Sequence, residues 1–389
     1  MRVLFYTHPH YLEPALEFTR AMAARTEFHL VLETTPRSKG FLLKGVPPRL
    51  PAGLLDADPI MRPLFPSAVP AYWEAAKSFR LASFANPGTL HPATVATSRA
   101  IVRAIERIAP DIVHFDDVSL RLALALPGLR AINLLNVHDP EPHTGDENWR
   151  TTLARRLVFP RVRRFRLHGR AFERRFGMRY RIPPDRIESI PMGPYDVFRS
   201  WVTRPVDRDA TMVLFAGRIQ AYKGLDILYA AAPSVARRVP GVRFVVAGEP
   251  VPGYQLPVPP ELPNGGRIDL LLDYIPSDRM AELQQRAAVV ACPYRDATQS
   301  GVVLTAYAFG TPVVATATGS LPEYVGDGQT GLLVEPGNAE QLADALVRAL
   351  TDGPLRRRMS EGIAHLRDGP MSWTRIAERV LDAYQLALE

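Results

Sequence analysis

The sequence predicts an α/β protein built from two doubly wound domains with parallel sheets. Short apolar runs rich in Val, Ile and Leu alternate with helical segments, which is typical of parallel strands covered on both faces. The alternation occurs twice and is interrupted near residues 193–206, where prolines and a glycine break both periodicities. At 389 residues the chain is also too long for a single core. We therefore expect one domain over residues 1–195 and a second over residues 196–370, followed by a terminal segment of residues 371–389.

The first half of the chain opens on a strand. The N-terminal sequence MRVLFYTHPH has only a short apolar run before it turns polar, so it predicts a first strand and not a signal peptide. A proline-rich stretch that reaches about residue 70 is predicted to be irregular. The expected strands are Arg2–Tyr6, Phe28–Glu33, Asp111–Phe115 and Ala131–Val137, and the expected helices are Pro14–Arg25 and Thr97–Ile108.

The second half repeats the alternation of strands and helices. Its expected strands are Met212–Ala216, Val242–Ala247, Ala288–Pro293 and Val313–Thr316. The proline-rich residues 249–266 are interpreted as stiffened loops. A final amphipathic helix is predicted from Ser372 to about Leu388, with a serine suited to cap its start.

The composition limits the class of protein. An apolar content of 47% and a charged content of 22% are ordinary for a globular chain. The single cysteine, Cys292, lies in an apolar run without an activating neighbour, so we interpret it as a core residue and expect no disulfide framework. No stretch approaches the roughly 18 apolar residues of a membrane span. These observations favour a cytoplasmic protein that is soluble or peripherally attached to a membrane.

Two strand-to-helix junctions in the second half are suited to bind a diphosphate. Ser300 and Gly301 stand where an apolar helix begins, and the unpaired N–H groups of a helix start attract anions. Arg218 and Lys223 follow an earlier strand and would supply mobile cations to the same anion. A junction with amides and a junction with cations together indicate a nucleoside diphosphate ligand.

Polar residues also follow three predicted strands of the first half. His8 follows the first strand, Asp116 and Asp117 follow the strand that ends at Phe115, and His138 and Asp139 follow the strand that ends at Val137. Since parallel sheets present functional groups at the carboxyl ends of their strands, we interpret these residues as the edge of a binding site. Asp116 and Asp117 could equally be helix caps. The histidines show no ligand spacing that favours a metal.

The motifs of the second half resemble those of glycosyltransferase family 4. FAGRIQAYKG, ATQSGVVLTAYAFGTPVVAT and GSLPEYVGDGQTGLLVEPGN are in the family's order and spacing over residues 211–340, and PDIVHF, NVHDP and IPMGPYD resemble it more weakly in the first half. The resemblance implies the GT-B fold, in which two Rossmann-like domains face a cleft and the last helix crosses back to the first domain. It also implies transfer of a sugar, with retention of configuration, from a UDP- or GDP-linked donor without a metal or another cofactor. The acceptor would be a glycan, a lipid-linked molecule or a small molecule.

The same resemblance implies roles for individual residues. His138, in NVHDP, would contact the donor sugar near the reaction centre, while Arg218 and Lys223 would bind the departing diphosphate, which makes these three the predicted catalytic residues. The nucleotide base would lie near residues 273–275. The predicted donor-binding residues are Gly217, Arg218, Lys223, Tyr274, Ile275, Asp296, Gln299, Ser300, Gly301, Thr305 and Glu323, and the predicted acceptor-side residues are His8, Asp116, Asp117 and Asp139.

One departure from the family bears on catalysis. The family usually has two glutamates with seven residues between them across this helix start, and here Ala297 and Thr305 stand at those positions. Two alternatives to a transferase therefore remain open. The protein could be a catalytically silent binding subunit of a glycan-assembly complex, or a GT-B enzyme of another reaction, such as a nucleotide-sugar epimerase or a phosphorylase.

Positive charge is concentrated in one segment. Residues 155–181 contain eleven arginines and a single acid, Glu173, whereas the whole chain has a net charge of +7. Apolar residues from Val158 to Phe176 are spaced as one helical face, with arginines on the others. The segment could be a solvated surface, or it could contact anionic lipid. Nucleic acid is a less supported partner, since no recognised binding motif accompanies the cluster.

Overall fold

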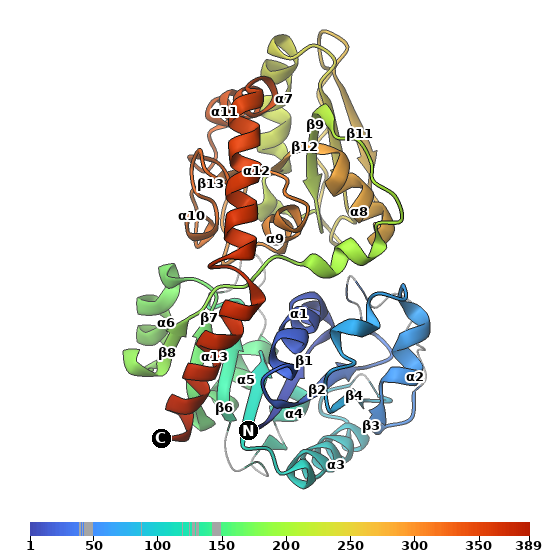
Figure 1. Ribbon diagram of the computed structural model, residues 1–389, viewed down its shortest axis with the longest axis vertical. Coiled ribbons are helices and arrows are strands. Elements are labelled where there is room, and N and C mark those ends of the chain that lie inside the picture. Colours follow the sequence, from blue (N-terminus) through green and yellow to red (C-terminus); the bar gives the residue numbers. More distant parts are fainter. Residues whose placement is uncertain are drawn as a thin grey trace.

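The chain folds into two α/β halves that follow one another along the long axis of the molecule (Figure 1). The computed structural model describes residues 1–38, 40, 42, 50–86, 88–118, 120–123, 125–126, 129, 132–141 and 149–389. Each half has a mainly parallel sheet with helices on both faces, so the predicted fold class is confirmed.

The N-terminal sheet has β1 near its centre. Over the described residues its strand order is β3-β4-β2-β1-β5-β6-β7-β8, and the β3–β4 pair alone is antiparallel. Its strands are β1 (Arg2–Thr7), β2 (Glu27–Thr34), β3 (Gly53–Asp56), β4 (Ser78–Ser83), β5 (Ile112–Asp116), β6 (Ile132–Val137), β7 (Val162–Leu167) and β8 (Ile187–Ser189). Its helices are α1 (Leu12–Ala23), α2 (Asp58–Met61), α3 (Pro92–Ile108), α4 (Leu120–Ala123), α5 (Trp149–Val158) and α6 (Glu173–Tyr180).

The C-terminal sheet is entirely parallel in its described pairs, with strand order β11-β10-β9-β12-β13-β14. Its strands are β9 (Asp209–Ala216), β10 (Arg243–Ala247), β11 (Arg267–Leu271), β12 (Ala287–Cys292), β13 (Val313–Thr316) and β14 (Gly331–Val334). The helices are α7 (Leu225–Arg238), α8 (Ser277–Arg286), α9 (Gly301–Ala308), α10 (Leu321–Tyr324), α11 (Ala339–Thr351), α12 (Gly353–Asp368) and α13 (Trp373–Leu388). The four strands predicted for this half are all present.

The arginine-rich segment is not the single amphipathic helix that its spacing predicted. It runs through α5, the strand β7 and α6, so the helical interpretation was wrong over residues 162–167. Within β7 the side chain of Arg166 is only 2% exposed. Its guanidinium donates hydrogen bonds to the carbonyl oxygens of Ile190 at 3.2 Å and Pro191 at 2.8 Å, which is how a buried strand accommodates this charge.

The C-terminal helix crosses back to the first domain, as the family resemblance implied. Figure 1 shows α13 beside β6, β7 and β8 of the N-terminal half. At the start of α13, Trp373 Nε1 donates a hydrogen bond to the carbonyl oxygen of Pro194 at 2.7 Å. Near the end of α13, Tyr384 is fully buried. One apolar core joins residues of both halves, including Phe5, Phe198 and Leu214, so the two domains pack through buried side chains.

Candidate functional site

Asp116 and His138 form a buried pair at the carboxyl edge of the N-terminal sheet. Asp116 ends β5, His138 follows β6, and each side chain is about 2% exposed. His138 Nε2 lies 2.7 Å from Asp116 Oδ1. The same carboxylate accepts hydrogen bonds from Thr7 Oγ1 at 2.7 Å and Asn136 Nδ2 at 2.8 Å. Burial alone would raise the pKa of Asp116, but His138 and the three hydrogen bonds hold it well below its usual range, so Asp116 is a carboxylate.

The imidazole of His138 is held between two aromatic rings. It stacks on Tyr11 with ring centroids 3.6 Å apart and planes inclined by 6°, and it lies against His168 at 4.6 Å. A cavity with room for about one water molecule is lined by His138, His168 and Arg166. Among the described residues, Nδ1 of His138 has no hydrogen-bond partner although it is buried. An orphaned ring nitrogen at this edge is suited to bind a ligand hydroxyl.

The other acceptor-side candidates do not join this pair. Asp117 adopts a φ of +66° and its carboxylate accepts from the backbone N–H of Val118 at 2.8 Å, so part of its role is to shape its own turn. Asp139 Oδ1 accepts from Thr298 Oγ1 at 2.5 Å, which links the edge of the first domain to the second. Both assignments to the acceptor side stay predictions.

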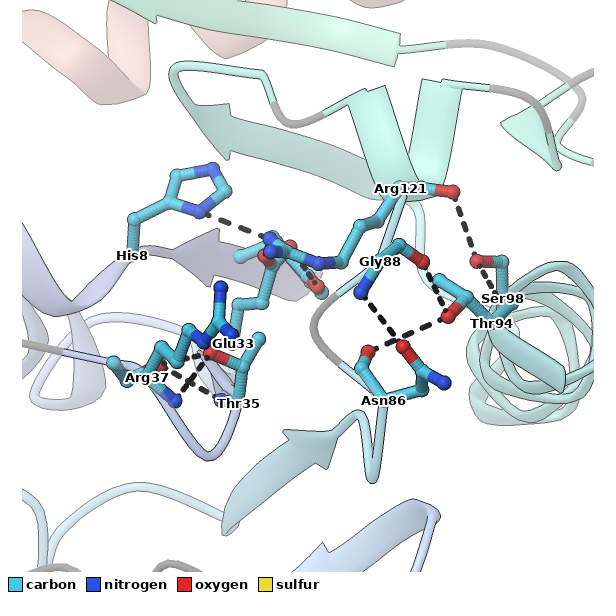
Figure 2. A network of polar contacts seen from close by, with 11 residues as sticks. His8, Glu33, Thr35, Arg37, Asn86, Gly88, Thr94, Ser98 and Arg121 are labelled. Atoms are coloured by element: carbon cyan, nitrogen blue, oxygen red, sulfur yellow. Dashed lines mark hydrogen bonds and ion pairs between the residues drawn. The ribbon is translucent and has the colours of Figure 1, made fainter. Parts of the chain in front are cut away.

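His8 belongs to a separate polar network, which Figure 2 shows. Its Nδ1 lies 3.8 Å from Glu33 Oε2, and Glu33 also accepts from Arg121 Nη1 at 2.8 Å and from Tyr6 Oη at 3.0 Å. Sequence reasoning missed Glu33 and Arg121. Glu33 could have been found as an acid near the end of a buried strand, but nothing local pairs it with Arg121, 88 positions away.

We expected Arg218 and Lys223 to be mobile cations, but their side chains lie in different surroundings. Arg218 is exposed, whereas the side chain of Lys223 is only 7% exposed. Burial lowers the pKa of Lys223 to about 8, with a smaller contribution from the charge of Arg218. Within the part of the chain that the structure describes, neither cation forms an ion pair with a carboxylate. A buried ammonium without a counter-ion is costly, so its position indicates an anionic ligand.

Lys223 lies beside the start of α9. A Cβ on Gly217 would be 2.8 Å from Lys223 Nζ and 3.2 Å from Val302 Cγ2, and φ at Gly217 is +93°. Glycine is therefore needed there both for its backbone angle and for the close approach. Ser300 caps α9, because its hydroxyl accepts from the backbone N–H of Val303 at 3.3 Å. The predicted cation and helix-start sites are thus neighbours in space.

The two positions that depart from the family are buried. Ala297 is 3% exposed and Thr305 is 7% exposed. The hydroxyl of Thr305 donates to the carbonyl oxygen of Gly301 at 2.7 Å, one helical turn earlier. Its proton is therefore committed to the helix, and only its lone pairs remain for a ligand.

The remaining donor-side candidates lie in different surroundings. Tyr274 is half-buried and Ile275 is 5% exposed in the interdomain core. Asp296 and Gln299 are half-buried in the loop before α9. Glu323 uses both carboxylate oxygens to accept from the backbone N–H groups of Arg170 and Ala171, each at 2.8 Å. Its contact is therefore with the N-terminal domain, a role that the sequence did not predict.

The two halves of the candidate site face one another. Desolvation and then the positive charge of Arg218 lower the pKa of His10, in the first loop of the N-terminal domain, to about 4. The hydrogen bond between Thr298 and Asp139 joins the loop before α9 to the loop after β6. Arg218 of the C-terminal domain thus acts on His10 of the N-terminal domain, and the loops of the two domains are in contact.

Two Rossmann-like domains and a returning C-terminal helix constitute the GT-B fold, so the resemblance to GT-B glycosyltransferases is confirmed. Residues 210–352 match the family described as Glycosyl transferases group 1. This match covers the strands and helices that carry Arg218, Lys223 and the start of α9.

Relatives and solved structures agree with this class. D-inositol 3-phosphate glycosyltransferase from Nocardia farcinica is 36% identical over 224 residues, which are 52% of this chain and 48% of that protein. The chain thus spans about half the length of the curated relatives it matches. Anabaena HepE in complex with UDP and glucose is similar with a TM-score of 0.67 at 16% identity, covering 99% of each chain. A UDP-GlcNAc 2-epimerase from Neisseria meningitidis has a TM-score of 0.57 at 12% identity, covering 99% of this chain and 100% of that one.

Proposed function

We propose that the protein is a retaining glycosyltransferase that uses a nucleoside diphosphate sugar. The observation that carries the proposal is the buried ammonium of Lys223, which has no carboxylate partner among the described residues and lies beside the start of α9. A diphosphate would neutralise this charge, and the exposed guanidinium of Arg218 would close on its other oxygens. The complexes of HepE with UDP and glucose support a uridine donor over a guanosine donor.

In this proposal the protein's own charges assist departure of the diphosphate. Negative charge grows on the leaving phosphate as the glycosidic bond breaks, and preorganised cations and amides stabilise that charge best in a site with little water. Lys223, Arg218 and the amides at Ser300 and Gly301 would take this role without a metal or another cofactor. Nδ1 of His138 would accept a hydrogen bond from a donor-sugar hydroxyl. The acceptor would enter from the side of the N-terminal domain.

Two alternatives are tested by the same assay. The buried Ala297 and Thr305 favour a silent binding subunit, because the hydroxyl proton of Thr305 is committed to Gly301. An epimerase is the second alternative, because a UDP-GlcNAc 2-epimerase has the same fold and the fold does not distinguish the two reactions.

The purified protein should be incubated with a panel of UDP and GDP sugars, with and without candidate hydroxyl acceptors. A transferase releases nucleoside diphosphate and the released amount rises with the correct acceptor. A silent subunit binds a nucleotide in a binding assay but releases no nucleoside diphosphate. An epimerase changes the configuration of the sugar without releasing the nucleoside diphosphate. The result expected for a silent subunit and the result expected for an epimerase would each overturn the proposal.

We further propose that the arginine-rich segment contacts an anionic membrane from the cytoplasmic side. No helix in the described part of the chain is both long and apolar enough to cross a bilayer, so attachment would be peripheral. Two of its arginines serve the interior, because Arg155 and Arg166 are buried. The exposed arginines of the segment are Arg156, Arg161, Arg163, Arg170, Arg174, Arg175, Arg179 and Arg181. Met178, which is 64% exposed on α6, adds an apolar side chain among them.

Vesicle sedimentation tests this contact. Binding should rise with the anionic lipid content and fall at high salt, because exposed charges are screened over about 10 Å at 0.1 M. Replacing Arg174, Arg179 and Arg181 together with glutamine should weaken it. As the matched control, glutamine at three exposed arginines of the C-terminal domain, Arg237, Arg348 and Arg357, should leave binding unchanged. Equal loss in both triple variants would show that only net charge matters and would reject this surface.

A further inference from the structure

The short helix α10 of the C-terminal domain contacts the N-terminal domain through its last residue, Tyr324. The Tyr324 hydroxyl donates to the carbonyl oxygen of His168 at 2.6 Å and accepts from the backbone N–H of Met192 at 3.1 Å. Tyr324 is 4% exposed, and burial raises its pKa, so the hydroxyl keeps its proton. One buried hydroxyl thus binds a donor and an acceptor on the backbone of the other domain.

Ser320 and Glu323 contact the same loop of the N-terminal domain. Glu323 accepts from the backbone N–H groups of Arg170 and Ala171, each at 2.8 Å. A Cβ on Gly169 would lie 2.1 Å from Ser320 Oγ and 2.5 Å from Ser320 Cβ, although its φ of −164° suits any residue. Glycine is therefore required at position 169 by the close approach of the two domains. We call Ser320, Glu323 and Tyr324 the α10 contact.

The α10 contact is connected to both parts of the candidate site. On the N-terminal side, the ring of His168 lies 4.6 Å from the ring of His138. On the C-terminal side, the hydroxyl of Tyr307 in α9 donates to the carbonyl oxygen of Tyr324 at 3.0 Å. Helix α9 begins at Gly301, where we place the diphosphate. The α10 contact therefore links the proposed phosphate site to the neighbour of the proposed sugar contact.

Hydrogen bonds constrain this interface in a way that its apolar core does not. The core shared by the domains includes Phe198, Tyr307 and Tyr324, but apolar burial is non-directional and permits small rotations of one surface on the other. A hydrogen bond weakens steeply when its angle departs from linearity. The hydrogen bond between Thr298 and Asp139 restrains one point of the cleft. A second restrained point at Tyr324 also limits rotation about the first.

We propose that Tyr324 is a positioning residue, which holds the start of α9 at the separation and angle from His138 that sugar transfer requires. This inference rests on the proposed function. A small misplacement of reacting groups lowers the rate of a reaction more than the affinity for the substrate. Lys223 and the start of α9 both belong to the C-terminal domain, so nucleotide binding should not depend on the α10 contact.

The first test separates rate from binding. Tyr324→Phe removes both hydrogen bonds and keeps the ring, so kcat should fall about tenfold, with the donor KM and the Kd for UDP within about twofold of wild type. Gly169→Ala should give the same pattern. Tyr229→Phe, in α7, and Gly353→Ala, whose Cβ would have the end of the Arg357 side chain at 3.6 Å as its nearest neighbour, are matched controls and should change neither quantity. An unchanged kcat in both Tyr324→Phe and Gly169→Ala would overturn the proposal.

A distance measurement tests the inference without an activity assay. Cysteines at the exposed positions Lys77 and Arg348 would carry one spin label in each domain, since the single natural cysteine, Cys292, is buried. Pulsed EPR should give a narrow distance distribution for the wild type and a broader or shifted one for Tyr324→Phe and Gly169→Ala. An unchanged distribution in both variants would refute the positioning role. If the wild type transfers no sugar, the proposed function fails, while the label distances still decide whether Tyr324 sets the arrangement of the domains.

Discussion

Lys223→Met should make the protein more stable and less active. The pKa of Lys223 is lowered from 10.5 to about 8, mainly by burial. Each pKa unit corresponds to about 1.4 kcal/mol, so keeping this ammonium charged in the folded state at pH 7 costs about 3 kcal/mol. Methionine fills a similar volume without a charge and should recover much of this free energy of unfolding. Turnover should fall by roughly two to three orders of magnitude, the scale of one lost oxyanion donor.

The sign of the pH dependence follows from the same pKa. Between about pH 8 and pH 10.5 the unfolded chain binds more protons at this lysine than the folded chain, so stability should rise with pH in that window. Lys223→Met should lack this rise. For the active enzyme, kcat/KM should decline above about pH 8, as the free protein loses the ammonium that receives the diphosphate.

Urea unfolding at pH 7 and pH 9.5, together with nucleotide-sugar turnover, measures both effects. Lys77→Met, at an exposed lysine of the N-terminal domain, is the control and should change neither stability nor turnover by a measurable amount. A destabilised Lys223→Met variant would show that the ammonium already has a counter-charge in the folded protein. Near wild-type turnover would remove Lys223 from the diphosphate site.

Three other variants distinguish the roles of site residues. Arg218→Ala should reduce turnover by roughly two to three orders of magnitude in the sugar-release assay, with an unchanged Tm because its side chain is exposed; normal turnover would exclude it from the site. Thr305→Ala should raise the donor KM at most about fivefold, since its hydroxyl proton serves Gly301, and a hundredfold rise would show that the threonine contributes strongly to donor binding. Glu323→Ala should lower Tm slightly and leave the donor KM unchanged, because its carboxylate holds the backbone of the other domain; an increased KM with an unchanged Tm would instead support donor binding.

The parts of the fold that local patterns determine were predictable. The predicted strands Met212–Ala216 and Val313–Thr316 are continuous apolar runs. Such runs are typical of strands that are buried on both faces of a parallel sheet. The strand β7 was missed because arginines interrupt its apolar residues. Arg166 is tolerated in that strand because its guanidinium donates hydrogen bonds to the carbonyl oxygens of residues 190 and 191. No local sequence pattern predicts these hydrogen bonds.

For the site residues, too, local sequence patterns predicted some features and not others. The position of Asp116 and His138 at strand ends could be predicted, since parallel strands bring their carboxyl ends to one edge. Their direct pairing, the burial of Lys223 and the contact of Glu323 with the first domain could not. Each depends on the approach of segments that are far apart in sequence, as Tyr324 and His168 are, separated by 156 positions.

The way in which each buried polar group is satisfied separates orienting residues from ligand-binding ones. Both oxygens of Asp116 accept hydrogen bonds from protein donors, two at Oδ1 and one at Oδ2, so its desolvation is offset within the fold. Lys223 is equally buried but has no carboxylate partner within the described residues, so its desolvation is offset only when an anion arrives. His138 combines the two conditions, with Nε2 committed to Asp116 and Nδ1 unpartnered. A residue with one atom fixed by the protein and one left for a ligand can be both precisely oriented and reactive, which is why we assign the sugar contact to His138 and not to Asp116.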